Sequence, residues 1–254
     1  MKTAENIKKN LCYYILIFGV LLFGIVMASL YSVPIFSKGL VFSLYTLTGM
    51  LLPGYALVNL LNIECKTDIE LIAYIIFFGY FVSFVQYFFV VPFGIQDYAF
   101  VVWIFFSVAS VLYLFLKNKR SLLISFKNKD DFGMWSCLLI FVLVLFVKCG
   151  LYAGQNLLPY DEVQITGIHE DLLYWIGNTV ELTKRFPPFN FRLYGQTYNY
   201  HYFSSVQLAM TSLATGISPG LVSLCFSYIY PSLMLVFGGY VVFSKCTQNN
   251  ILRV

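Results

Sequence analysis

Residues 71–91 read LIAYIIFFGYFVSFVQYFFVV, a run of 21 residues that contains no charged side chain. A helix needs about 20 predominantly apolar residues to cross the roughly 30 Å hydrocarbon core of a bilayer. A membrane-spanning strand would need about ten residues of alternating polarity, and this run does not alternate. The stretch therefore predicts a transmembrane helix and places the chain among the helical membrane proteins.

The composition of the whole chain agrees with this assignment. The chain has 254 residues, of which 59% are hydrophobic and 11% are charged, and its mean hydropathy is +0.77. Soluble proteins carry about 25% charged residues, so the deficit indicates that lipid is the main solvent. The net charge of +4 is small and scattered, which argues against nucleic-acid binding. We expect an all-α, polytopic protein that forms a single integral membrane domain over residues 1–254.

Working outward from residues 71–91, the sequence contains six runs of comparable length and polarity: 11–30, 39–61, 71–91, 98–116, 134–153 and 221–243. The first run is too long for the apolar region of a signal peptide, so we interpret it as an uncleaved span. The second run contains Pro53 and Gly54, which interrupt the hydrogen-bond ladder of a helix and predict a kink.

The orientation follows from the basic residues, which are enriched in cytoplasmic loops. The strongest basic cluster separates the fourth and fifth spans and comprises Lys117, Lys119, Arg120, Lys127 and Lys129. Six spans then place both termini in the cytoplasm and residues 155–203 outside the cytoplasmic (inner) membrane. Residues 203–215 are apolar but short, and we expect a helix embedded from the outer side. A full crossing there would move the C-terminus to the other side.

The predicted outer loop, residues 155–203, is the polar region of this chain. It contains both histidines and five of the twelve carboxylates. Residues 161–182 fit an amphipathic helix that lies along the membrane surface. Its apolar face is expected to comprise Ile165, Ile168, Leu172, Trp175, Ile176 and Thr179, and Asp171 lies beside that face in line with Asn178. The pair Pro187 and Pro188 should end the helix.

The sequence carries no recognisable signature of a bound cofactor. The six cysteines are dispersed without a CxxC pair, and no zinc-type spacing of histidine, cysteine and aspartate occurs. Glycine loops for nucleotides and a GxSxG nucleophile motif are also absent from the sequence. We therefore expect no cofactor, although a requirement for a divalent metal ion stays open.

Within this loop, an acidic pair at Glu170 and Asp171 is followed by FPP at residues 186–188, Gly195 and YNYHYF at residues 198–203. This order resembles the first outer loop of the GT-C superfamily of membrane glycosyltransferases. That superfamily includes protein O-mannosyltransferase-like and aminoarabinose transferase-like enzymes. The resemblance implies the transfer of a sugar from a polyprenyl-phosphate donor to an acceptor on the outer face of the membrane.

The resemblance also implies a role for the carboxylates. An inverting transfer needs a carboxylate base within hydrogen-bond reach of the acceptor hydroxyl. Asp171, with Glu170 beside it, is the first choice for that base. The second acidic pair, Asp161 and Glu162, has the order that is commoner among these enzymes. The assignment therefore stays open between Asp171 and Asp161.

Substrate binding is expected from cations and aromatic rings, because the departing lipid phosphate is anionic and sugar rings stack on aromatic faces. The expected phosphate ligands are Lys184, Arg185 and Arg192, and the expected sugar-binding residues are Tyr198, Tyr200, His201 and Tyr202. Each also has a simpler interpretation, since aromatic side chains form belts at membrane interfaces and carboxylates can mark the wet face of a surface helix.

A second class of function competes with the enzyme. The chain could be a non-catalytic membrane subunit or a transporter of lipid-linked glycans. GT-C enzymes usually have more than six spans, so the chain could be truncated or need a partner chain that supplies further spans. A transporter, however, would place ionisable residues near the membrane midplane.

Overall fold

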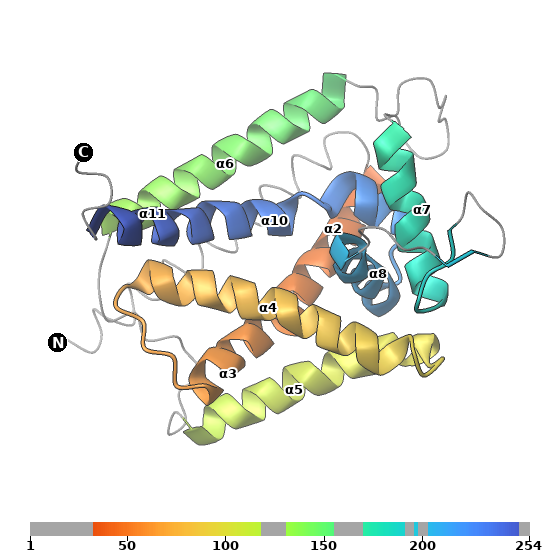
Figure 1. Cartoon of the computed structure of the whole chain (residues 1–254), viewed down its shortest axis with the longest axis horizontal. Coiled ribbons are helices and arrows are strands. Elements are labelled where there is room, and N and C mark those ends of the chain that lie inside the picture. Colours follow the sequence, from red (N-terminus) through yellow and green to blue (C-terminus); the bar gives the residue numbers. More distant parts are fainter. Residues whose placement is uncertain (1–32, 118–130, 155–169, 191–195, 198–202, 249–254) are drawn as a thin grey trace.

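The computed structural model describes residues 33–117, 131–154, 170–190, 196–197 and 203–248 (Figure 1). The secondary structure of these residues is helical, apart from one isolated antiparallel bridge between Phe189 and Thr197. The first three helical rods are α2 (Val33–Tyr45) with the π-helical turn η1 (Thr46–Leu51) and α3 (Leu52–Leu60), then α4 (Asp68–Val90), then the short η2 (Gln96–Tyr98) with α5 (Ala99–Lys117). They are followed by α6 (Asp131–Gly154), α7 (Glu170–Lys184) and α8 (Phe203–Thr215). The last rod comprises α9 (Pro219–Leu221), η3 (Val222–Phe226), α10 (Ile229–Leu233), η4 (Met234–Gly238) and α11 (Gly239–Gln248).

Among the described residues, four helices are long and apolar enough to cross a membrane. They are Ser37–Leu60, Asp68–Val90, Gln96–Lys117 and Pro219–Cys246, which correspond to the second, third, fourth and sixth predicted spans. The prediction of a helical integral membrane protein is thereby confirmed. The fifth predicted span coincides with α6, whose described apolar part, Trp135–Leu145, is shorter. Residues 11–30 lie outside the described residues, so the count of six spans stays a prediction.

The helix of the second span departs from regular α-helical geometry just before Pro53, in the π-helical turn η1, and side chains from two other spans bond to the backbone carbonyl groups there. Pro53 has no backbone N–H, so the carbonyl four residues earlier, on Gly49, loses its helical donor. Gln86 on α4 donates from Nε2 to that carbonyl at 2.7 Å. The π-helical turn η1 also displaces the donor of the Thr48 carbonyl, and Ser107 on α5 donates from Oγ to it at 3.0 Å. The interruption is therefore accommodated by polar contacts with α4 and α5.

Glycine allows α3 and α4 to approach closely at this level. A Cβ atom added to Gly54 would lie 2.6 Å from the backbone nitrogen of Gly79 and closer still to the carbonyl oxygen of Ile75. Small residues at such contacts are typical of helix pairs in membranes. The Tyr230 hydroxyl on α10 donates to the carbonyl oxygen of Ile76 at 2.7 Å. The last rod is thereby fixed to α4 near the same crossing.

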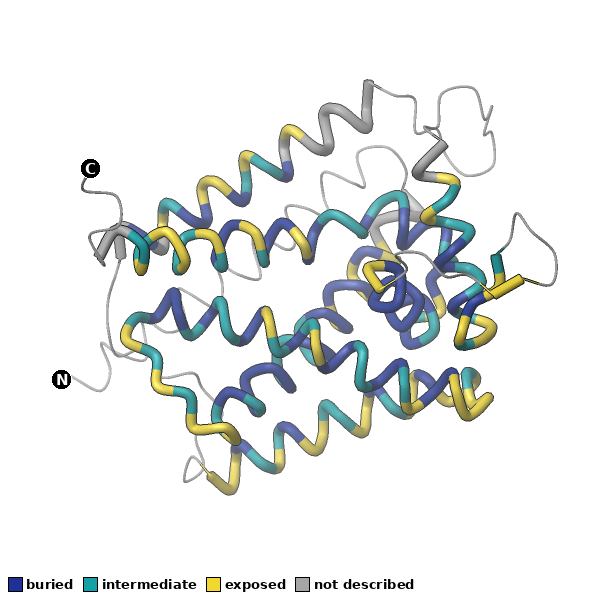
Figure 2. The backbone as a smooth tube through the Cα atoms, in the orientation of Figure 1, coloured by how far each residue is buried: buried dark blue, intermediate teal, exposed yellow. Residues whose placement is uncertain are grey.

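Two helices, α7 and α8, run across the others rather than alongside them. In Figure 1, α4, α5, α6 and the α10–α11 rod follow the long axis, whereas α7 stands across their ends and α8 is seen nearly end-on. With 13 residues, α8 is about 20 Å long, which is too short to cross a bilayer. It is buried along most of its length (Figure 2). These features agree with an embedded helix that does not cross the membrane.

The four candidate spans define two ends of the molecule. At one end, Lys245 on α11 forms an ion pair with Glu70 on α4, with Nζ and Oε1 2.8 Å apart. Lys117, the last residue of α5, donates to Oδ1 of Asn62 at the same end, at 2.9 Å. At the opposite end, the C-terminal part of α4 contacts α7. The last residue of α5 and the end of α11 therefore lie at one end of the molecule, and α7 lies at the other.

Candidate functional site

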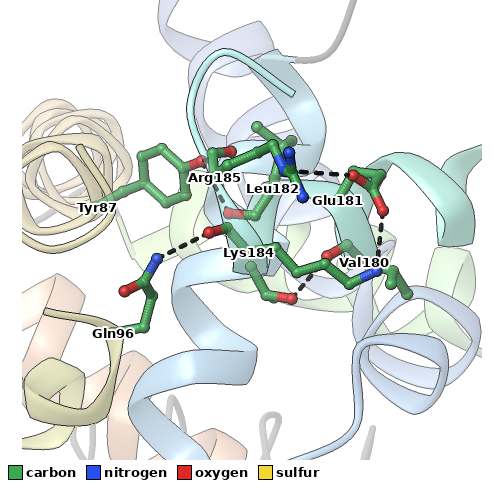
Figure 3. Close-up of polar contacts among 8 residues, drawn as sticks. Tyr87, Gln96, Val180, Glu181, Leu182, Lys184 and Arg185 are labelled. Carbon is green, nitrogen blue, oxygen red and sulfur yellow. Dashed lines mark hydrogen bonds and ion pairs between the residues drawn. The ribbon is translucent and has the colours of Figure 1, made fainter. Parts of the chain in front are cut away.

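The C-terminal end of α7 is fixed to the corner between α4 and α5. The last carbonyl groups of a helix lack partners within the helix and need donors from elsewhere. The Tyr87 hydroxyl on α4 donates to the carbonyl oxygen of Leu182 at 2.9 Å, and Gln96 in η2 donates from Nε2 to that of Lys184 at 2.9 Å (Figure 3). These two bonds come from residues about 90 positions earlier in the chain. They give the end of α7 a defined position.

Two of the predicted phosphate ligands, Lys184 and Arg185, meet at this end. Both contact Glu181, with Lys184 Nζ 2.9 Å from Oε1 and Arg185 Nε 3.9 Å from Oε2 (Figure 3). The Arg185 guanidinium also lies over the ring of Phe189, 4.2 Å from its centroid. The side chains of Lys184 and Arg185 are 54% and 47% exposed, whereas that of Glu181 is 14% exposed. Among the described residues, one carboxylate thus faces two accessible cations, which favours an anionic ligand.

The turn after α7 connects this cation pair to an apolar surface. The helix ends at Lys184, before Pro187 and Pro188, as their sequence position predicts. The ring of Phe186 then packs edge-on against Phe88 of α4, with centroids 5.0 Å apart. Asn190 donates its backbone N–H to the carbonyl oxygen of Gln196 at 2.8 Å, next to the bridge between Phe189 and Thr197. Arg185 is therefore adjacent in sequence to a residue that contacts α4.

A groove of about 530 Å³ lies on the surface of α4 next to this turn. It is lined by apolar side chains: Phe81, Phe84, Val85, Phe88, Phe89 and Phe93. Phe88 belongs both to the groove and to the contact with Phe186. The groove thus has hydrocarbon-like walls, and its residue Phe88 contacts the turn that follows α7.

The buried face of α7 only partly matches the predicted apolar face. Thr179 is buried as predicted, and its Oγ1 accepts a hydrogen bond from Ser223 Oγ at 3.2 Å. Trp175 is 51% exposed although it lies one turn from Thr179 on the same predicted face. The helix packs on α8, α9 and η3 through Asn178, Thr179 and Leu182. The predicted face is therefore divided between protein contacts and a tryptophan that can lie at the membrane interface.

Asn178 is a residue to which the sequence pattern assigned no role. Asn178 is 1% exposed, and within the part of the chain that the structure describes neither its amide nitrogen nor its amide oxygen has a hydrogen-bond partner. Leaving a buried polar group unpaired costs about 1–3 kcal/mol. The sequence feature that could have drawn attention to Asn178 was its position next to the apolar face of an amphipathic helix.

The predicted general base is separated from the cation pair. Glu170 and Asp171 are the first two residues of α7. Asp171 precedes Lys184 by 13 residues, which corresponds to about 20 Å along the axis. Asp171 thus begins α7 at the end opposite to Lys184 and Arg185.

The other predicted site residues lie outside the described residues: Asp161, Glu162, Arg192, Tyr198, Tyr200, His201 and Tyr202. Among the described residues there is no group of three or more histidine, cysteine, aspartate or glutamate side chains that could hold a metal ion. The part of the candidate site that the structure describes is therefore the cation pair, its carboxylate partner Glu181 and the groove on α4.

Comparison with known proteins adds no assignment. The chain matches no protein-family model, no curated protein and no solved structure.

Proposed function

We propose that this chain is a membrane glycosyltransferase that moves a sugar from a polyprenyl-phosphate donor to an acceptor on the outer face of the cytoplasmic membrane. The observation that carries the proposal is the position of Lys184 and Arg185. They are half exposed at the end of a helix that lies across the ends of the candidate spans. The donor's phosphate would lie at that depth, because its chain is in hydrocarbon and its sugar is in water.

The chemistry of the two cations suits a phosphate ligand. The planar guanidinium of Arg185 can bind two phosphate oxygens at once, which an ammonium group cannot do. The ring of Phe189 beneath it limits its rotation, and Glu181 holds Lys184 nearby. Charge-assisted hydrogen bonds of this kind are about twice as strong as neutral ones. The pair is therefore suited to hold the lipid phosphate in the ground state and as it leaves.

The distance along α7 limits which carboxylate can be the base. If Lys184 and Arg185 hold the donor phosphate, the base belongs to the other acidic pair, and Asp161 is the first choice. If Asp171 is the base, the phosphate has a different ligand, for which Arg192 is the predicted residue. The two arrangements predict different results for the same pair of variants.

The test compares Asp171→Asn with Asp161→Asn in full-length protein, at matched expression, in a sugar-transfer assay with polyprenyl-phosphate donors. Asparagine keeps the size and much of the hydrogen bonding of aspartate but cannot act as a base. Loss of the base should reduce the rate by about 10²–10⁴. A large loss in one variant alone identifies the base. Full activity in both variants, or no transfer by the wild type with any donor, would refute the proposed reaction.

The proposed orientation has its own test. We propose six spans, cytoplasmic termini and an outer loop at residues 155–203. Thr183→Cys, in a background without the native cysteines, should react with a membrane-impermeant thiol reagent in intact cells. Labelling only after lysis would place α7 on the cytoplasmic side and remove the basis for an outer-face reaction.

A transporter of lipid-linked glycans has less support. In the four candidate spans, the charged residues lie close to the span ends: Lys38, Asp68, Glu70, Asp97, Lys117 and Lys245. The polar side chains deeper in these spans, such as Gln86 and Tyr45, are neutral and hydrogen-bonded to each other. This pattern is unlike the ionisable residues near the midplane that transporters use.

A further inference from the structure

Three consecutive helices and the π-helical turn after them form one cluster, which we call the cap: α7, α8, α9 and η3. Within the cap, α7 packs on α8, α9 and η3. Thr179 on α7 accepts a hydrogen bond from Ser223 on η3 at 3.2 Å. Ser212 on α8 donates from Oγ to the carbonyl oxygen of Ile217, just before α9, at 2.6 Å. These polar contacts join the parts of the cap to one another.

The cap lies on the rest of the molecule through a mainly apolar interface. The helix α8 packs against α2, α4 and α5. Its Gln207 reaches out of the cap to the sulfur of Met50, a weak acceptor, at 3.8 Å. The ring of Phe226 on η3 stacks on that of Phe42 on α2, with centroids 4.7 Å apart. Such contacts lack strong directional bonds, so packed helices can slide over one another.

Stronger bonds hold the cap at the end of α7. Among the described residues, the hydrogen bonds between the cap and the hairpin of α4, η2 and α5 come from Tyr87 and Gln96. Their acceptors are the carbonyl oxygens of Leu182 and Lys184, each 2.9 Å away. The bond from Gln96 is exposed, so water can replace either partner when it breaks. These two bonds can therefore act as a latch.

The helix is interrupted where the cap joins the last rod. Ser227 and Tyr228 form a turn between the end of η3 and the start of α10. The cause is Pro231, which has no N–H for the carbonyl of Ser227 four residues earlier. Directly after the turn, the Tyr230 hydroxyl donates to the carbonyl oxygen of Ile76 at 2.7 Å and holds α10 on α4. A fixed helix thus follows an interruption that adjoins the cap.

We propose that the cap moves as one body on α4 and α5, about a hinge at Ser227 and Tyr228, and that Tyr87 and Gln96 latch it closed. Hinges commonly consist of a few residues at the ends of elements. Release of the latch moves the end of α7, with its cation pair, away from the corner between α4 and α5. The device regulates access to that end, and it does not depend on the reaction proposed above.

The test measures distances between two spin labels by double electron–electron resonance. It uses the full-length chain in lipid nanodiscs, in a background without the native cysteines. The cap pair is Leu173→Cys on α7 and Phe105→Cys on α5, and the control pair is Leu116→Cys and Leu235→Cys, outside the cap. All four native side chains are exposed, so labels fit at each position. With the latch closed, each pair should give one narrow distance distribution.

The latch variant Tyr87→Phe, Gln96→Ala should open the cap. The segment of α9 and η3 is about 12 Å long, and a rotation of about 20°, the size of a helix kink, moves its end by roughly 4 Å. The cap pair should therefore gain a second population displaced by roughly that distance, and the control pair should not change. An unchanged cap pair, or an equal change in both pairs, would overturn the proposal.

A proline variant tests the position of the hinge. Pro231→Ala supplies an N–H for the Ser227 carbonyl, so in the latch variant it should remove most of the second population. Pro53→Ala is the matched control, because it straightens a helix outside the cap and should leave the second population unchanged. Persistence of that population in Pro231→Ala would refute the hinge. The latch variant keeps Pro231, so it decides whether the cap moves even if Pro231→Ala does not fold.

Discussion

Two regions differ in whether their buried polar groups are hydrogen-bonded: the helix around Pro53, and α7. At the break, Gln86 donates to the released carbonyl of Gly49 and accepts from the Tyr45 hydroxyl at 2.9 Å. On α7, the amide of Asn178 is just as buried but has no partner among the described residues, and the two cations at the helix end share one carboxylate.

The hydrogen-bond pairing of a buried polar group indicates whether that group stabilises the fold. A hydrogen bond to a buried group adds only about 1 kcal/mol, but the absence of that bond costs more. A fold therefore satisfies polar groups wherever their only role is to stabilise it. Unpaired buried groups and accessible charges persist where a ligand or a reaction needs them. We therefore interpret the Gln86 contacts near Pro53 as structural, and the accessible charges at the end of α7 are the ones that the proposed function uses.

The largest effect should come from the crossing of α3 and α4. Gly54→Ala places a methyl group against the backbone of Ile75 and Gly79, so the helices must separate. We expect a loss of about 3 kcal/mol in unfolding free energy, or failure to fold. Gly238→Ala is the control, because a Cβ there meets no atom within 4 Å. Equal stability of the two variants in detergent unfolding experiments would contradict the crossing.

Gln86→Leu tests whether the Pro53 network is structural. It leaves the Gly49 carbonyl and the Tyr45 hydroxyl without their partner, so stability should fall by about 2 kcal/mol. Pro53→Ala restores a backbone N–H that can bond to Gly49. The cost of Gln86→Leu should therefore be about 1 kcal/mol smaller in the Pro53→Ala background. An identical cost in both backgrounds would show that Gln86 does not compensate for the proline.

Asn178→Leu should do the opposite and increase stability. Leucine has a similar volume and removes the two unpaired amide atoms, so we expect a gain of about 1 kcal/mol in unfolding free energy. The neighbouring change Thr179→Val removes the acceptor of Ser223 Oγ and should reduce stability instead. If Asn178→Leu is destabilising, the asparagine has a partner and the contrast between the two regions is lost.

The smallest effect should come from the end of the bundle opposite α7. Lys245→Met removes the ion pair with Glu70, but Lys245 is half exposed and Glu70 keeps the backbone N–H of Lys66 at 2.6 Å. We expect the free energy of unfolding to fall by roughly 0.5–1 kcal/mol, which is typical of such exposed ion pairs. Thermal unfolding at low and high salt measures it, because screening should remove most of the difference. A loss as large as that of Gln86→Leu would show that this end has a larger structural role.

Features encoded in consecutive residues were predictable from the sequence. The long apolar runs predicted the four candidate spans, Pro53 predicted an interruption of the helical hydrogen bonds, and Pro187 predicted the end of α7 close to its observed position. The separation of Asp171 from Lys184 also follows from their sequence spacing once both lie on one helix.

Features that depend on partners distant in the chain were not predictable. Helical periodicity could not show that Gln86 bonds to Gly49 or that Tyr87 bonds to the end of α7, because those pairs are 37 and 95 residues apart. For the same reason, helical periodicity predicted the same burial for Trp175 and Thr179. The actual burial of α7 depends on how α8 and η3 pack against it.

The central claim is that Lys184 and Arg185 bind a lipid phosphate, whereas the other polar regions serve the fold. The direct measurement is the Kd of undecaprenyl phosphate for the wild type and for the double variant Lys184→Gln, Arg185→Gln. Lys245→Gln serves as a control that removes a positive charge at the opposite end. The double variant should bind at least roughly tenfold more weakly, and the control should bind like the wild type. Unchanged affinity in the double variant, or an equal loss in the control, would contradict the claim.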